Sequence, residues 1–338
     1  MINYKQITIP FFIPHAGCPH QCYFCNQNHI TAESIRITKE EISKRTKQYL
    51  FLKNNNINHV EIAFFGGSFT GLDDDYQREL LGEALNFKNQ KDVDAIRVST
   101  RPDYITDEKI QLLKEYNVDT VELGVQSFFD DVLTASNRGH TSDDVYKAVD
   151  LLKKKGFSIV LQLMTGLPED TFEKSIISME KAVSLKPDGV RIYPVVVMKN
   201  TYLNTMFENK LYEPLNMEQA IDICSKMMII CNREKIPVIK TGLHPFEQNN
   251  LDTIVAGPYH TTFGFFVKSR VKRHELQLLM KNNCDDNWKD IIMKIPNKEK
   301  EEFIGYKREN IIYLENLFKV KIEIVFSDEE KPEIKESF

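Results

Sequence analysis

The chain has 338 residues, of which 42% are hydrophobic and 28% are charged, and its formal net charge is −5 at pH 7. These values are ordinary for a soluble globular protein, with room for one barrel-sized domain and a smaller second one. The negative charge excludes bulk attraction to nucleic acid, although it leaves room for a local basic patch. No apolar run is long enough to span a membrane, and the N-terminus has no charged-then-apolar leader, so we expect a cytoplasmic protein.

Strand and helix signals alternate through the first two thirds of the chain. Repeated strand–helix units predict parallel strands with right-handed crossovers. Six units are too few for a closed eightfold barrel, so we expect an α/β fold with a partial, open (β/α)6-type barrel and a functional site at the carboxyl ends of its strands. The predicted strands are Ile7–Ile13, Val60–Phe65, Ala95–Ser99, Thr120–Val125, Ser158–Leu163 and Gly189–Val197, and the predicted helices are Lys39–Leu52, Asp75–Leu85, Asp107–Glu115, Ser142–Lys155 and Thr171–Leu185.

A seventh unit is compatible with the pattern, as helix Met217–Glu234 and strand Ile236–Ile239. The alternation then weakens into turn-rich sequence, which predicts a barrel domain over residues 1–245 and a small α+β domain over residues 246–338. The charged tail 327–338 predicts a frayed end.

Three cysteines, Cys18, Cys22 and Cys25, follow the first predicted strand with the spacing Cys-x3-Cys-x2-Cys. Thiolates held this close share one soft metal centre more readily than they pair as disulfides. Three ligands on a four-iron cluster would leave one iron without a protein sulfur, where a substrate or cofactor could coordinate.

The triplet alone leaves a structural zinc site open as the main alternative. His15, His20 or His29 could supply its fourth ligand. A disulfide framework is disfavoured by the chain length, the odd local count and the absence of a signal peptide. Two other cysteines, Cys224 and Cys231, lie one heptad apart in a predicted helix, where buried thiols are the simplest interpretation.

A glycine pair follows the second predicted strand, in Phe64-Phe-Gly-Gly-Ser-Phe-Thr-Gly71. Paired glycines allow the backbone to approach a ligand and expose carbonyls that can hold an amino group, although such pairs also form ordinary tight turns. Further along, the chain carries in order Thr100-Arg-Pro-Asp103, Gly124-Val-Gln-Ser127, Asn137-Arg-Gly-His-Thr141, Gly166-Leu-Pro168 and Tyr193-Pro194.

With the cysteine triplet, these motifs resemble the radical S-adenosylmethionine (SAM) superfamily over about residues 5–243. The likeness is to the radical SAM domain of the Elongator catalytic subunit and, more loosely, to oxygen-independent coproporphyrinogen oxidase. The resemblance implies that the three cysteines hold a 4Fe-4S cluster whose open iron takes SAM. Phe24 fits the aromatic residue that the family carries between its second and third cysteines. Gly66, Gly67 and Ser68 would hold the methionine amine of SAM, with Ser68 in place of the usual glutamate.

By the same resemblance, Gln126 would hydrogen-bond the ribose of SAM and Arg138 would pair with its carboxylate, which a guanidinium can bind bidentately. Ser99 stands where coproporphyrinogen oxidase has an acidic ribose ligand, and a hydroxyl can still hydrogen-bond there. Without the cysteines, Gln126 could equally be a strand-end amide and Arg138 a surface side chain.

Three more residues follow from the resemblance at the ends of the fifth and sixth strands. Met164 and Leu167 lie where the family packs the adenine, although apolar residues on a strand are more often plain core. Tyr193 would face the same mouth and could touch SAM or the substrate.

The implied chemistry begins with an electron from a reductant such as flavodoxin or ferredoxin. SAM is then cleaved to methionine and a 5′-deoxyadenosyl radical, which abstracts a hydrogen atom from an unreactive carbon. The protein orients the reactants and excludes water and oxygen, so an oxygen-sensitive enzyme is expected.

The C-terminal part predicts a strand at Ile291–Ile295, a helix, a tight loop, a helix and a second strand. From about residue 285 this order resembles the core of a KH domain, whose Gly-x-x-Gly loop clamps nucleic-acid backbone. Gly305 matches the first glycine and Arg308 replaces the second, while Tyr306, Lys307 and Arg308 would bring stacking and basic groups to RNA. A small packing appendage is the alternative, because the segment 298–321 is close to charge-balanced.

The leading hypothesis is therefore a radical SAM enzyme that modifies RNA, most plausibly tRNA. No glycine-rich acetyl-CoA loop is found and the C-terminal part is too short for an acetyltransferase domain, so Elongator-type carboxymethylation is not expected. The alternatives are a radical SAM enzyme acting on a small molecule or peptide, and a non-catalytic RNA-binding protein with a structural metal.

Overall fold

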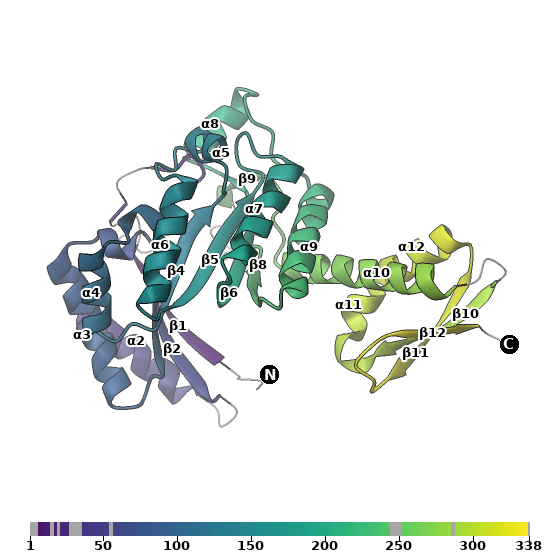
Figure 1. Cartoon of the computed structure of the whole chain (residues 1–338), viewed down its shortest axis with the longest axis horizontal. Coiled ribbons are helices and arrows are strands. Elements are labelled where there is room, and N and C mark those ends of the chain that lie inside the picture. Colours follow the sequence, from purple (N-terminus) through teal and green to yellow (C-terminus); the bar gives the residue numbers. More distant parts are fainter. Residues whose placement is uncertain are drawn as a thin grey trace.

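The main sheet contains seven parallel strands in the order β1-β2-β3-β4-β5-β6-β8. The structure is a computed structural model that describes residues 6–13, 17–18, 21–26, 36–53, 57–243, 252–284 and 288–336. The sheet curls into an open half-barrel with helices along its outer side (Figure 1). The predicted α/β partial barrel is confirmed, and the seventh unit that the sequence allowed is present.

The strands and helices alternate as predicted, with small shifts at their ends. The strands of the barrel are β1 (Gln6–Ile13), β2 (His59–Gly66), β3 (Ala95–Thr100), β4 (Thr120–Gln126), β5 (Ser158–Thr165), β6 (Gly189–Pro194) and β8 (Val238–Thr241). The connecting helices are α2 (Lys39–Phe51), α3 (Asp74–Asn89), α4 (Asp107–Glu115), α5 (Asp130–Ala135), α6 (Ser142–Lys154), α7 (Phe172–Ser184), α8 (Tyr202–Glu208) and α9 (Met217–Arg233).

Short polar residues fix where most of these helices begin. Thr38, Thr106, Thr141 and Thr171 each accept a hydrogen bond from a backbone N–H in the first turn of α2, α4, α6 and α7, respectively. Such N-caps satisfy donors that have no partner within the helix. The starts of these helices are thus encoded locally, which explains why they fall where the sequence predicts them.

The predicted sixth strand was too long, because β6 ends at Pro194. The next residues, Val197–Met198, form β7 and pair in antiparallel fashion with β9 (Ile254–Ala256) in a separate two-stranded sheet. A proline has no N–H to continue a hydrogen-bond ladder, so the chain leaves the barrel sheet here.

The largest apolar cluster lies between the outer face of the sheet and its helices, and includes Ile62 and Phe64 of β2 with Leu80 and Leu81 of α3. None of the helices in the described part of the chain is long and apolar enough to cross a membrane.

A long helix, α10 (Phe263–Asn283), leads into the C-terminal unit (Figure 1). Phe263 and Val267 belong to the apolar cluster of the barrel, whereas Leu276 and Met280 belong to a second cluster. The second cluster is completed by β10 (Asp290–Pro296), α11 (Lys300–Ile304), α12 (Glu309–Phe318) and β11 (Lys321–Ser327). One helix is therefore shared by both hydrophobic cores.

The C-terminal sheet has the order β11-β10-β12, with β10 and β11 parallel. Its third strand, β12 (Glu333–Glu336), pairs in antiparallel fashion with β10, so the prediction of a frayed tail was wrong. Backbone pairing with β10 orders this charged segment, and that contact leaves no signal in its composition. The domain boundary near residue 245 and the KH likeness stay predictions.

Candidate active site

The cysteine loop follows β1 and lies against the turn that follows β2. Gly17 has a positive φ of +73°, and a Cβ at this position would clash with the carbonyl oxygen of Ser68. A Cβ at Gly71 would clash with the carbonyl of Gly17 in turn. Two glycines therefore bring the two segments into backbone contact. Neither was among the predicted site residues, since only the contact itself distinguishes them from other loop glycines.

The same loop is fastened on its other side to the segments around α5 and α8. The Tyr23 N–H donates to the Ser136 carbonyl at 3.1 Å, and the Leu203 N–H donates to the Tyr23 carbonyl at 2.9 Å. The Asn137 amide donates to the Gln21 carbonyl at 2.9 Å. The loop is thus positioned at the carboxyl ends of the strands, where the fold predicts a site.

The thiols of this loop lie in a cationic environment. The Arg138 Nη1 is 3.4 Å from the Cys22 Sγ, and Cys22 is buried. Burial raises the pKa of the Cys18 thiol, while the backbone of Ser68 and the charges of Arg138 and Arg101 act in the opposite direction. Guanidinium groups favour the thiolate, which is the form that ligates iron.

No disulfide joins any of the six cysteines, all of which lie in the described part of the chain. Among the described residues, no three His, Cys, Asp or Glu side chains are gathered closely enough to hold one metal ion. The assignment of Cys18, Cys22 and Cys25 as cluster ligands therefore stays a prediction. The three histidines proposed as alternative zinc ligands, His15, His20 and His29, lie outside the described residues.

Gly124, Gln126 and Arg138 are packed together at the end of β4. The Arg138 Nη2 donates to the Gly124 carbonyl at 2.7 Å. A Cβ at Gly124 would lie 2.7 Å from that nitrogen and 3.0 Å from the Gln126 Nε2, so only glycine leaves room for both side chains. Gln126 itself has a φ of +66°, at an irregularity in the pairing of β4 with β5. Backbone strain at a non-glycine residue is frequent at functional sites.

Several buried polar atoms at this mouth lack a hydrogen-bond partner within the described part of the chain. They are the Ser99 Oγ, the Gln126 Oε1, the Arg138 Nε and the Arg101 Nη1. A buried polar group without a partner costs about 1–3 kcal/mol, so native proteins rarely keep a group of them. SAM offers an ammonium, a carboxylate and ribose hydroxyls, which supply both donors and acceptors. These residues therefore fit SAM.

The glycine pair after β2 is shaped by its backbone. Gly66 has a φ of +101°, and the Gly67 N–H donates to the Ile13 carbonyl at 2.7 Å. The Ser68 hydroxyl lies 2.9 Å from the Thr100 Oγ1, so it links two loops of the mouth. Any contact of this segment with SAM would therefore come from its backbone rather than from the Ser68 hydroxyl.

Phe24, Met164 and Leu167 are brought together in one small apolar cluster. The cluster also contains Val132 of α5 and Leu203 of α8, so it lies between the cysteine loop and the ends of β5 and β6. This position is compatible with the predicted contacts to the adenine, which stay a prediction.

Tyr193 belongs to a network of buried charges on the inner face of the sheet. Its hydroxyl accepts a hydrogen bond from the Arg191 Nη1 at 3.1 Å, and the Arg191 Nε lies 2.9 Å from the Glu122 Oε2. Arg97 links Glu122, at 3.5 Å, to Glu61, at 3.0 Å. Burial raises the pKa of Glu122, which the two arginines oppose. These charges were absent from the predicted site, although they alternate with apolar residues along their strands.

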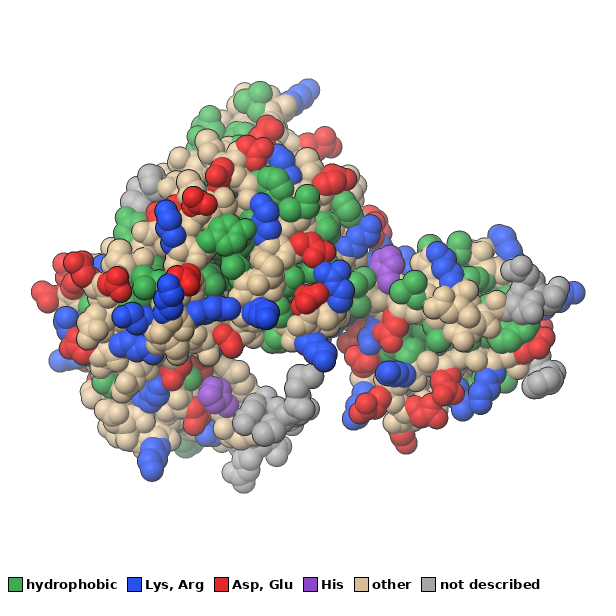
Figure 2. Space-filling model, in the orientation of Figure 1, with side chains coloured by type: hydrophobic (Ala, Val, Ile, Leu, Met, Phe, Trp, Pro, Cys, Tyr) green, Lys and Arg blue, Asp and Glu red, His purple; other side chains and the backbone are tan. Residues whose placement is uncertain are grey.

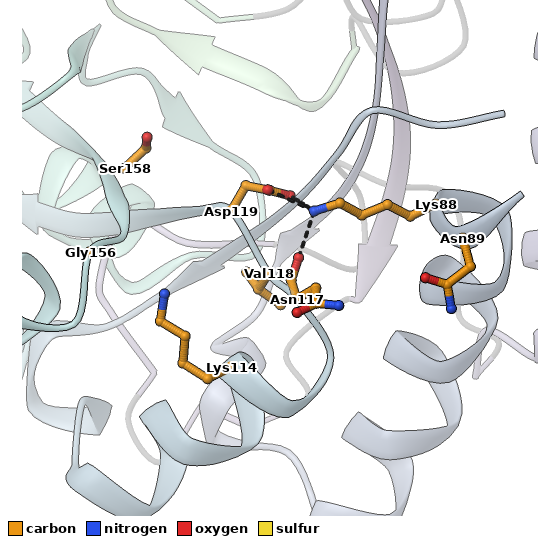
Figure 3. Close-up of a pocket in the computed structure, with 8 residues that line it drawn as sticks. All are labelled: Lys88, Asn89, Lys114, Asn117, Val118, Asp119, Gly156 and Ser158. Atoms are coloured by element: carbon orange, nitrogen blue, oxygen red, sulfur yellow. Dashed lines mark hydrogen bonds and ion pairs between the residues drawn. The ribbon is translucent and has the colours of Figure 1, made fainter. Parts of the chain in front are cut away.

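A depression at the opposite end of the barrel does not belong to this site (Figure 3). It is lined by the ends of α3 and α4 and the starts of β4 and β5. Lys88 points into it and donates to the Asp119 carboxylate at 2.6 Å and to the Asn117 carbonyl at 2.8 Å. The lysine thereby neutralises the C-terminal end of α4 and the Asp119 carboxylate, which is a structural role.

Two sequence-family models match the chain. The model of the radical SAM superfamily matches residues 12–180, and that of the radical SAM C-terminal domain matches residues 187–273. The second match spans β6, α9 and the first half of α10, so it includes the barrel portion of the shared helix.

Among curated proteins, the tRNA uridine(34) acetyltransferase of Methanocaldococcus jannaschii is 31% identical over 188 residues, which cover 50% of this chain and 35% of that protein. The Elongator complex protein 3 of Schizosaccharomyces pombe is 26% identical over 211 residues, which cover 56% of this chain and 39% of that protein. The chain thus spans little more than a third of the length of these relatives.

Among solved structures, the archaeal Elp3 of Methanocaldococcus infernus with an N-terminal deletion superposes with a TM-score of 0.63 at 21% identity. The match covers 80% of this chain and 63% of that chain, and at this identity it establishes the fold alone. Together with the motif matches, these comparisons confirm the predicted resemblance and argue against a non-catalytic protein. The chain belongs to the radical SAM superfamily and is an enzyme whose cofactors are a 4Fe-4S cluster and SAM.

Proposed function

We propose that this radical SAM enzyme modifies a structured RNA, with tRNA as the first candidate. The observation that carries the proposal is the match of its barrel to proteins named for tRNA uridine acetyl transfer and for Elongator. Since only about a third of those proteins is matched, their acetyl transfer is not part of the proposal. The proposal also includes a cytoplasmic location and a reductant of the flavodoxin or ferredoxin type.

The mouth of the barrel supplies the residues for radical formation. When bound, the cluster and SAM supply a 5′-deoxyadenosyl radical that abstracts a hydrogen atom. Cys18, Cys22 and Cys25 would hold the cluster as thiolates, with the guanidinium of Arg138 beside Cys22. The free Arg138 Nε would orient the carboxylate of SAM.

Other residues of the mouth would bind the remainder of SAM. The partnerless oxygens of Gln126 and Ser99 would hold ribose hydroxyls. The apolar cluster around Met164 and Leu167 would cover the adenine and exclude water.

A loop of the C-terminal unit offers a contact for RNA backbone. Tyr306 is 54% exposed, and Lys307 and Arg308 beside it are exposed as well. The backbones of both basic residues adopt the left-handed conformation, with φ values of +49° for Lys307 and +64° for Arg308. A non-glycine residue in this conformation costs about 1–2 kcal/mol, so the loop is held in place by its surroundings. Two cations and an aromatic ring on a fixed loop suit phosphate and base contacts.

The support for this loop is the side chain of Asn310, which is completely buried. Its amide nitrogen donates to the carbonyls of Ser269 and Glu302 at 3.0 Å, and its oxygen accepts from the Arg273 Nε at 2.8 Å. Next to it, a Cβ at Gly305 would lie 3.0 Å from the Asn310 Cγ. The amide thereby fixes the loop to both α10 and α11.

The basic character of this loop is local. Figure 2 shows acidic and basic side chains interspersed over the visible face of both halves of the molecule, in agreement with the net charge of −5. We therefore expect a short contact with RNA at Lys307 and Arg308 rather than a broad electrostatic surface.

The proposal is tested by nucleoside mass spectrometry of RNA from strains with and without the gene. We expect one modified nucleoside to disappear on deletion and to return with the wild-type gene but not with Cys22→Ser. An unchanged set of nucleosides, with 5′-deoxyadenosine formed on a metabolite extract instead, would establish the small-molecule alternative.

The loop is tested by the double variant Lys307→Glu/Arg308→Glu. It is expected to weaken RNA binding and flatten its salt dependence, while formation of 5′-deoxyadenosine without RNA is unchanged. The matched control is Lys319→Glu/Lys331→Glu, which makes the same charge change at exposed positions of the same unit. Point variants are preferable to truncation, because removal of residues 285–338 would expose Leu276 and Met280 of α10.

A further inference from the structure

Two aromatic rings lie on the inner face of the half-barrel, next to the mouth. Phe12 of β1 and Phe65 of β2 are paired in the sheet, and their ring centroids are 6.0 Å apart. Both are half-buried, and neither joins an apolar cluster of the described residues, whereas the outward-facing Phe11 and Phe64 are fully buried in the main core. Part of each ring therefore stays accessible for contact with a ligand.

Arg191 reaches this pair from the other side of the barrel. Its strand, β6, is separated from β2 by three strands in the sheet order. Nevertheless its guanidinium carbon lies 5.4 Å from the centre of the Phe65 ring. The curl of the sheet therefore brings opposite walls together, and Arg191 crosses the interior between them.

The guanidinium is held in this position at two points. The Nε pairs with Glu122 at 2.9 Å and the Nη1 donates to the Tyr193 hydroxyl at 3.1 Å. A guanidinium carries five N–H donors, so these two contacts leave donors for a further group. Glu122 and Tyr193 thus act as positioning residues for Arg191.

The residues around Arg191 and Phe65 lie next to those that fit SAM. Ser99 of β3 is the backbone partner of Glu122 in β4. Its strand is also the neighbour of β2, which carries Phe65. A ligand stacked on Phe65 would therefore lie beside the Ser99 hydroxyl, next to the position proposed above for the ribose of SAM.

We infer that Phe12, Phe65 and Arg191 form the substrate subsite, and that it takes a single unstacked nucleobase that carries a carbonyl oxygen. The base would stack on the two rings, and its carbonyl would accept hydrogen bonds from Arg191. A guanidinium offers donors only, so the subsite favours uracil, cytosine or guanine, whose carbonyl oxygens are stronger acceptors than the ring nitrogens of adenine. Only a base rotated out of its helix could reach the inner face of the barrel. This inference rests on the proposed function.

The test compares Phe65→Leu and Arg191→Lys with the wild-type enzyme. The RNA probe is total tRNA from the gene-deletion strain, and its binding is measured by filter retention without reductant. We expect about five- to hundredfold weaker binding for both variants, the range for loss of a stacking partner by Phe65→Leu and of a bidentate base contact by Arg191→Lys. Phe65→Tyr keeps the ring and should remain close to wild type.

Arg97→Lys is the matched control for a purely structural role of the charged network, because Arg97 pairs with the same Glu122 but contacts no aromatic ring among the described residues. It should leave RNA binding within about twofold of wild type, since it lacks the stacking contact. As competitors, uridine, cytidine and guanosine monophosphates should displace the tRNA more effectively than adenosine monophosphate.

The possible failures are distinct. Wild-type binding by both Phe65→Leu and Arg191→Lys, or equal competition by all four nucleotides, would overturn the subsite while leaving RNA modification intact. An equal loss with Arg97→Lys would assign the effect to the network and also overturn the subsite. No nucleoside change between strains would overturn the proposed function itself.

Discussion

The mouth of the barrel and the C-terminal unit differ in whether their buried polar groups have hydrogen-bond partners. At the mouth, oxygens and nitrogens of Ser99, Gln126 and Arg138 have no partner within the described chain. In the described part of the C-terminal unit, the amide of Asn310 is fully buried, and its donors and its acceptor are satisfied by residues of α10 and α11. The buried polar groups of the first region need a ligand to complete their hydrogen bonds, whereas those of Asn310 are satisfied within the chain.

The difference separates two kinds of substitution. Changes at these unpartnered groups should damage cofactor binding and leave stability nearly intact, because without SAM such groups do not stabilise the folded state. Changes at the Asn310 amide should damage stability and leave the chemistry of SAM intact. The following predictions test this separation, from the largest expected effect to the smallest.

The largest effect is expected for Cys22→Ser. With one thiolate removed, the cluster should not assemble, so iron should fall from about four per chain towards zero and 5′-deoxyadenosine should not form. Both are measured after anaerobic reconstitution. Cys284→Ser, which removes a thiol in the C-terminal unit, should retain iron and activity. Normal iron content in Cys22→Ser would contradict the ligand assignment.

Asn310→Ala is expected to destabilise the C-terminal unit by about 3–5 kcal/mol, because several buried groups lose their partner at once. The measurement is the free energy of opening from hydrogen exchange in β10 and β11. Asn283→Ala, which removes an exposed asparagine with a single contact, is the control and should change stability by less than about 0.5 kcal/mol. Loss of SAM cleavage in Asn310→Ala would break the proposed separation.

Gly124→Ala should weaken SAM binding about ten- to hundredfold, since the added methyl group displaces the Arg138 guanidinium from the Gly124 carbonyl and the Cys22 sulfur. Equilibrium binding of SAM to the reconstituted enzyme measures this. Gly82→Ala, in the middle of α3, is the matched control, because its Cβ would make only an ordinary contact of 3.7 Å. Equal SAM affinity of the two variants would show that the Gly124 position does not shape the site.

The effect that is smallest at neutral pH is a pH dependence from His140. Burial lowers its pKa to about 3, and its Nε2 lies 3.1 Å from the Val125 carbonyl. The unfolded chain binds a proton below about pH 6.5 and the folded chain does not, so stability falls as the pH drops from 6.5 towards 3, by at most about 1.4 kcal/mol per unit.

The check is denaturant unfolding of wild type and His140→Gln across that range. The glutamine keeps a donor for the Val125 carbonyl and cannot titrate. The free energy of unfolding of the variant should therefore fall less steeply with decreasing pH, by the slope that corresponds to one proton. Identical slopes for the two proteins would show that His140 does not contribute.

The sequence predicted the barrel well because its signals are local. The threonine N-caps and the apolar runs of β1 to β6 lie within the segments that they shape. Site residues could be proposed where a residue type is chemically distinctive, as for the cysteines and Arg138, and their roles stay predictions. Gly17, Gly71 and the Arg191–Phe65 contact were not predictable, because their meaning depends on segments that meet only in the fold. The strand β12 was missed for the same reason.

The shared helix α10 fixes the two halves of the molecule in angle as well as in distance. Arg270 pairs with Glu218 of α9 on the barrel, while Ser269 and Arg273 hold Asn310 beneath the basic loop. These contacts alternate around one helix, in which each residue advances the direction by about 100°. Inserting one residue between Val267 and Ser269 would therefore turn the loop by more than a quarter of a circle relative to the barrel mouth. If the loop binds RNA as proposed, the phase of α10 would set the direction from which that RNA meets the mouth of the barrel.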